Sequence, residues 1–134
     1  MLLLNPRKVT FGEVTWGNVA SVAIGRSAHR MLVEWSDSGP HAVLADVSEQ
    51  RVRVEVVQEL LGEDMDTPKP GESGALAFTT APTSTDLPSR ELTMTAVVES
   101  VSYEVSLRRG SVRRVVLVAT SIDGGTDPVA VDDA

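Results

Sequence analysis

The chain has no cysteine among its 134 residues. This absence excludes a disulfide framework, thiolate zinc sites and a cysteine nucleophile, and it is compatible with a reducing compartment. Aromatic residues are also scarce, at 4% against 42% hydrophobic residues in all. The core must therefore be built from Val, Leu and Ala, which suits a β-sheet.

Long apolar runs are missing as well. None approaches the ~20 residues that a membrane helix needs, and residues 1–6 are too few and not basic enough for a signal peptide. We therefore expect a protein made in the cytosol that does not itself bind a membrane. A length of 134 residues fits a single domain over residues 1–134. A domain of this size can bury a core without disulfides or metal ions to stabilise it.

Basic residues are outnumbered. Twelve Lys and Arg against 19 Asp and Glu give a formal net charge of −7. This balance argues against a protein that grips nucleic acid by its phosphates, because such a protein needs a basic surface. An acidic wall would instead repel phosphates, so DNA could pass without being bound. Charge that simply keeps the protein soluble is the alternative.

Catalytic motifs are absent too. The sequence contains no G-x-S-x-G, no phosphate-binding Gly-rich loop and no H-E-x-x-H, so we expect neither enzyme activity nor a cofactor. His29 and His41, with Asp46 and Glu49 downstream, could in principle supply a metal site. Isolated histidines in β proteins are more often structural, so no metal is expected.

Trp16 and Trp35 could stack on nucleic-acid bases. No basic stripe interleaves with them, however, and we expect both to be anchors in a core or an interface.

Helical periodicity is weak throughout. The best candidate is residues 59–65, one or two turns before Thr67 and Pro68. Elsewhere the pattern indicates strands and turns. The expected strands are residues 8–11, 14–16, 18–28, 29–35, 42–45, 50–60, 74–80, a long pair within 92–122, and 128–131. The sequence thus predicts an all-β fold, mainly an antiparallel β-barrel or sandwich, with at most one short helix.

Residues 50–60 show the cleanest alternation in the chain. Val52, Val54 and Val56 face one way, while Arg51, Arg53 and Glu55 face the other, as expected for a half-buried antiparallel strand.

Residues 92–122 predict two long strands joined by a tight turn at residues 109–111. Typical strands have about 5–6 residues, and a pair this long suggests a surface shared with neighbouring subunits. The first strand changes phase at residues 98–100, since Val98 is apolar on an even position and Val101 on an odd one. Either the strand passes from its own core to a neighbour, or a simple β-bulge lies there.

Four arginines bracket the tip of this hairpin. They are Arg108, Arg109, Arg113 and Arg114. In an acidic chain we expect them to pair with carboxylates of an adjacent subunit, and charge reversal at the last two to weaken assembly without unfolding the subunit. A charged tip that discourages edge pairing is the alternative.

Three stretches resemble a known family. They are the alternating strand 49–56 (EQRVRVEV), residues 95–106 (TAVVESVSYEVS) and residues 118–129 (VATSIDGGTDPV). With the strand order, they make the chain similar over most of residues 7–131 to contractile-phage tail tube proteins and their relatives, including the tube-forming rings of type VI secretion. The flanking helix of that family is barely visible in this sequence.

The resemblance implies hexameric rings that stack into a hollow tube, with long strands from all subunits lining the lumen. It also implies a virion tail assembled in the host cytoplasm, neighbouring sheath, baseplate and tail-terminator proteins, and DNA passage without specific binding. Candidate lumen-facing residues are Arg51, Arg53, Glu55, Glu99, Ser100 and Ser102. The alternatives are a tube initiator or baseplate adaptor of the same fold, or a small β-barrel domain that binds a ligand or peptide.

Overall fold

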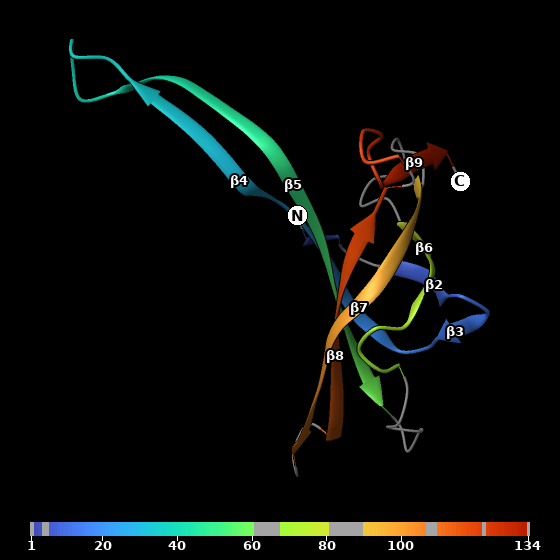
Figure 1. Ribbon diagram of the computed structural model, residues 1–134. Helices are drawn as coiled ribbons and strands as arrows, with labels where there is room; N and C mark the ends of the chain where they lie inside the picture. The colour runs from blue at the N-terminus through green and yellow to red at the C-terminus, as the bar shows by residue number, and fades with distance from the viewer. Residues whose placement is uncertain are drawn as a thin grey trace, which may run out of the picture.

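The computed structural model describes residues 2–3, 6–60, 68–80, 90–106, 110–121 and 123–133. These residues form one antiparallel sheet and no helix, which confirms the predicted all-β class (Figure 1). The strands are β1 (Leu2–Leu3), β2 (Pro6–Phe11), β3 (Val14–Trp16), β4 (Val19–Trp35), β5 (Ala42–Leu60), β6 (Ser73–Thr80), β7 (Arg90–Ser106), β8 (Gly110–Thr120) and β9 (Ala130–Asp133).

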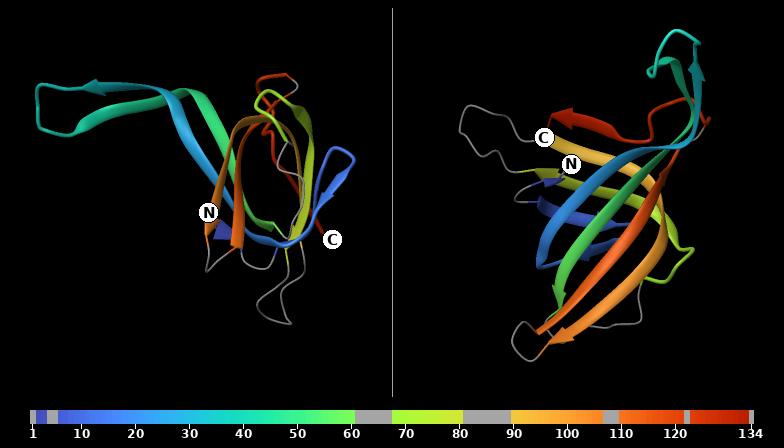
Figure 2. Two further views of the ribbon diagram at one scale, coloured as in Figure 1. Left: turned by 90° about the horizontal axis from the view of Figure 1, so that it is seen from below. Right: turned by 90° about the vertical axis from the view of Figure 1, so that its left-hand side faces the viewer.

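The sheet curls strongly, as the end-on view in Figure 2 shows. Its hydrogen-bonded order is β1-β4-β5-β8-β7-β6-β2-β3, with β9 added to one end of β7. This order has two ends, at β1 and β3, so the described sheet stops short of a closed barrel.

The concave face of the curled sheet holds the core. Alternate positions of each strand point inward, as the period of two requires. On β5 these are the predicted Val52, Val54 and Val56, at 4%, 0% and 0% exposure. The other large members of the core are Val9, Phe11, Trp16, Val22, Ile24, Leu76, Phe78, Leu92, Met94, Val98, Val115, Leu117 and Val129.

The phase change in β7 is a β-bulge. Val98 pairs with Leu117 of β8 and Ser100 pairs with Val116, so Glu99 is the extra residue. Beyond it, Val101 still packs against the same core cluster as Val98. The bulge therefore keeps Val98 and Val101 on the concave face, which confirms the expected β-bulge at this position.

The long hairpin has 17 residues in β7 and 11 in β8. Gly110 opens β8 with φ +72° and pairs with Ser106, so Gly110 and Ser111 belong to the strand rather than to the predicted turn at 109–111. Much of this pair is covered by the chain's own core. The most extended pair is instead β4–β5, with 17 and 19 residues, which the sequence divided into shorter strands.

The predicted helix at 59–65 falls partly outside the described residues. Glu59 and Leu60 end strand β5 and pair with β8, so they are not helical. Residues 61–65 are not among the described ones.

Candidate assembly surface

The far half of the β4–β5 hairpin leaves the curled sheet as a two-stranded projection, residues 25–50, which we call the arm (Figures 1 and 2). Its root is marked by a change in burial. Val22 and Ile24 are 0% and 5% exposed, whereas residues 25–35 are exposed throughout. On β5 the corresponding change comes just before the buried Val52.

One face of the arm is apolar. Cross-strand partners in an antiparallel pair share a face, and the apolar pairs are Met31–Val47, Val33–Ala45 and Trp35–Ala42. Met31 is 54% exposed and Trp35 is 63% exposed. The opposite face is mixed, because it carries the pairs Leu32–Asp46 and Glu34–Leu44. The arm is thus an amphipathic ribbon whose apolar face the chain itself leaves uncovered.

Two adjacent bulges give the arm this arrangement. Between the pairs Ala28–Gln50 and Met31–Val47, each strand contains one extra residue, His29 in β4 and Ser48 in β5. An extra residue reverses the alternation of a strand. Because both strands reverse together, the apolar face of the arm continues the concave face that carries the core.

The strand edges of the arm are also unpaired within the described residues. β1 reaches only Ala23 of β4, and the pairing of β8 with β5 begins at Val52. A two-stranded ribbon is marginally stable in water by itself, and open edges invite pairing with another chain. The arm therefore combines an apolar face and open edges, both of which a partner would cover.

The six candidate lumen residues lie together on the convex face of the sheet. At its centre Glu99, placed by the bulge in β7, reaches across β8. It accepts from Arg51 Nη2 at 3.1 Å and from Arg53 Nε at 3.2 Å. The three side chains are between 32% and 49% exposed, so each pair stabilises the fold by about 1 kcal/mol at most.

The other candidates extend the same surface. Glu55 pairs with Arg114 Nε at 2.8 Å. Ser100 and Ser102 are exposed and lie across from Val116 and Arg114. The convex face thus has its arginines engaged by carboxylates. The sequence predicted the polar faces of two separate strands, and the structure brings them together on one surface.

Arg113 corrects one expectation. It is only 5% exposed, so it does not lie on the surface of the hairpin tip as an inter-subunit residue. Its Nη2 donates to Gln58 Oε1, and its guanidinium carbon lies 5.3 Å from the centre of the Trp16 ring. Reversing its charge would put a carboxylate into this buried contact, so we expect that variant to destabilise the subunit itself, contrary to the prediction that it would stay folded. Arg114 is exposed, while Arg108 and Arg109 lie outside the described residues.

The two tryptophans lie in different settings. Trp16 is a core residue at 7% exposure, with its ring centre 5.5 Å from that of Phe11. Trp35, by contrast, lies on the arm's apolar face at 63% exposure.

His29 and His41 both lie in the arm and are exposed. Among the described residues, no three His, Cys, Asp or Glu side chains come close enough to hold a metal ion.

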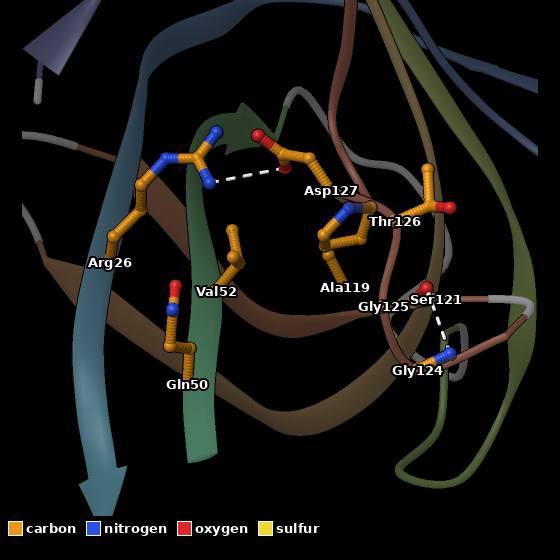
Figure 3. Close-up of a pocket in the computed structure, with 10 residues that line it drawn as sticks. Arg26, Gln50, Val52, Ala119, Ser121, Gly124, Gly125, Thr126 and Asp127 are labelled. Atoms are coloured by element: carbon orange, nitrogen blue, oxygen red, sulfur yellow. Dashed lines mark hydrogen bonds and ion pairs between the residues drawn. The ribbon is translucent and has the colours of Figure 1, made fainter. Parts of the chain in front are cut away.

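A pocket that the sequence does not predict lies beside the root of the arm. Its volume is about 430 Å³, and it is lined by Arg26, Gln50, Ser121 and residues 124–128 among others (Figure 3). Asp123 organises the loop by accepting from the backbone N–H groups of Gly125 and Thr126, at 2.9 and 2.8 Å, and from the Thr126 hydroxyl at 2.8 Å. These bonds, that from the Thr126 N–H foremost, hold the pKa of Asp123 well below its usual range.

Asp127 faces the arm from the same loop. It accepts from the Val129 N–H at 3.0 Å and from Arg26 Nη1 at 3.1 Å. The first bond and then the arginine lower the pKa of its carboxyl. The contact between Asp127 and Arg26 joins residues 101 positions apart, so it depends on tertiary structure.

No protein-family model and no curated protein matches this chain. Within the described residues, the structure contains no helix with the length and hydrophobicity needed to cross a membrane. The arm, the convex face and the pocket at the root of the arm are therefore the features from which a function can be inferred.

Proposed function

We propose that this chain is a structural protein of the phage tail tube type, which assembles into hexameric rings that stack as a hollow conduit for DNA. The observation that carries the proposal is the apolar face of the arm. Trp35 and Met31 are 63% and 54% exposed on a ribbon with open edges. Exposed apolar surface of this kind marks an interaction site.

The partner that fits is a second copy of the chain. The apolar face of the arm continues the concave face of the sheet. A second copy that packs on it would therefore bury apolar side chains of the same kind as those in the core. An arm that extends from one copy and docks on a different surface of the next forms a heterologous contact. Such contacts generate closed rings or open helical filaments. Strands joined across many copies also enclose a channel wider than one chain can form.

The role in DNA passage is passive. If the convex face lines the conduit, its arginines are already held by Glu99 and Glu55. They are therefore poor partners for phosphates, and the net charge of −7 adds long-range repulsion. DNA would slide past such a wall without specific binding.

The setting that goes with this function is a virion tail assembled in the host cytoplasm, with sheath, baseplate and tail-terminator proteins as neighbours. A tube initiator or baseplate adaptor would use the same arm, and copy number per particle would separate it from the repeating tube subunit.

A small ligand-binding barrel has weaker support. The concave face of the described sheet is filled by core side chains, and the pocket at the root of the arm is lined by polar groups such as Arg26 and Asp127.

The experiment is to purify the chain and follow its assembly with concentration, by light scattering and negative-stain microscopy. We expect rings or tubes from the wild type. Trp35→Ser removes a side chain from the apolar face, while Glu34→Ser is the matched control on the opposite face. Because a buried Trp at an interface commonly contributes 2 kcal/mol or more, Trp35→Ser should raise the concentration required for assembly at least about tenfold.

Two results would count against the proposal. A wild-type protein that stays monomeric at every concentration would overturn self-assembly. Equal effects of Trp35→Ser and Glu34→Ser would remove the apolar face from its assigned role.

A further inference from the structure

We propose that Arg26 and Asp127 are positioning residues that bias the direction of the arm, with residues 123–129 acting as a strut at its root. This inference rests on the proposed function, because a direction matters only if the arm must meet a second copy. It assigns a role to a loop and a pocket that the convex face and the arm do not explain.

The ion pair lies where the arm begins. Arg26 pairs across the ladder with the buried Val52 and follows shortly after Ile24, the last buried residue of β4. Its Nη1 lies 3.1 Å from Asp127 Oδ1, and Figure 3 shows the two side chains pointing toward one another across the pocket. Among the described residues of β4, Arg26 is the last one along the chain whose side chain bonds to a residue outside the arm.

The loop is built to hold Asp127 still. Besides its bonds from Gly125 and Thr126, Asp123 accepts from the Ser121 hydroxyl at 3.1 Å, and Ser121 Oγ in turn accepts from the Gly124 N–H at 3.2 Å. On the other side, Val129 is 7% exposed in the core and donates its N–H to Asp127. Asp127 is therefore preorganised between a closed turn and a core residue, so less entropy is lost when Arg26 binds it.

The arm needs such a strut because its own root is weak. Within the described residues, the pairing of β8 with β5 begins at Val52, the ladder partner of Arg26, so outward of this row the hairpin has only two strands. From there outward, the described contacts of the arm are those between its own two strands. Without the ion pair, the arm would bend more freely about this row, where the third strand ends.

The strut biases the direction of the arm rather than locking it. Arg26 and Asp127 are 50% and 54% exposed, and ion pairs at such sites are weak and screened by salt. We expect its loss to increase the population of misdirected arms by roughly two- to fivefold. Assembly should slow by a similar factor.

Distances between spin labels test this directly. The chain has no cysteine, so spin labels would attach only to two introduced cysteines. These are Ser38→Cys, at the end of the arm, and Thr95→Cys, at an exposed position of β7. The measurement uses dilute full-length monomer and is therefore independent of assembly. We expect a narrow distribution in the wild type, and equal broadening in Asp127→Asn and Arg26→Gln.

The variants are chosen to separate the strut from general damage. Asp127→Asn removes the charge but keeps a carbonyl oxygen for the Val129 N–H. The double variant Arg26→Asp with Asp127→Arg restores an ion pair of reversed polarity and should narrow the distribution in part, because an arginine at position 127 cannot accept from the Val129 N–H. Arg114→Gln removes the Glu55 pair away from the root and serves as the control.

An unchanged distance distribution in Asp127→Asn would overturn the strut. Broadening without slower assembly would overturn its positioning role. If the wild type fails to assemble at all, the proposed function falls, and the label distances still report on the strut by themselves.

Discussion

At the scale of single residues, Arg113 shows how a polar side chain can be part of a core. Its guanidinium donates to Gln58, and Gln58 Nε2 donates to the Gly17 carbonyl at 2.7 Å. Gln58 itself is 3% exposed. The relay joins β8, β5 and the segment after β3, with the Trp16 ring against the arginine. The sequence placed four arginines at a hairpin tip but could not distinguish this one, because its burial depends on distant strands.

The relay predicts a specific cost for losing Gln58. Gln58→Leu keeps similar volume but leaves the Arg113 guanidinium and the Gly17 carbonyl without this partner. We expect the free energy of unfolding to fall by about 1–3 kcal/mol, the usual cost of an unsatisfied buried polar group. Urea denaturation measures it. The control Gln50→Leu changes an exposed residue of the same strand and should cost less than about 0.5 kcal/mol. Equal costs would mean that the relay contributes nothing.

At the scale of strands, alternation in the sequence predicts most of the fold. The pattern in residues 50–60 placed Val52, Val54 and Val56 inward correctly, and the break at residues 98–100 marked the bulge at Glu99. The same logic failed at β4. Residues 18–28 and 29–35 read as two strands because the bulge at His29 breaks their alternation, although the ladder runs through it. A bulge and a strand end look alike in sequence, since only the partner strand distinguishes them.

The bulge in β7 allows substitution and deletion to be compared at one position. Glu99→Ala removes the ion pairs to Arg51 and Arg53 and should lower the free energy of unfolding by about 2 kcal/mol at most, because each pair is partly exposed to solvent. Deleting Glu99 instead reverses the faces of one half of β7. Side chains such as Met94 and Val98 each contribute roughly 1.5–3 kcal/mol when buried, so the deletion should cost more than about 3 kcal/mol.

Chemical denaturation of both variants measures the difference. Similar costs would show that the ladder can shift its register, and that the bulge does not fix the faces of β7.

At the scale of the whole molecule, the curled sheet and the arm differ in whether the chain itself covers their apolar side chains. The curled sheet encloses its own core, and no residue between 28 and 50 belongs to the core cluster. The arm has no such enclosure. The sequence indicated a pair of strands too long for one subunit to cover, but placed it at residues 92–122. The hydrophobic content of both hairpins is similar, and only the fold decides which one the core covers.

This division predicts that the arm can be removed from a folded protein. Ser27 and Arg51 are cross-strand partners, so residues 28–50 can be replaced by Asn-Gly, which closes a two-residue hairpin. The core and the Arg26–Asp127 pair remain. We expect the free energy of unfolding to stay within about 1 kcal/mol of the wild type, measured by urea denaturation, and a monomer in light scattering at concentrations at which the wild type assembles. Rings or tubes from the armless chain would show that another surface carries assembly. An unfolded product would show that the arm belongs to the folding unit, and that the sheet depends on contacts made along the full length of β4 and β5.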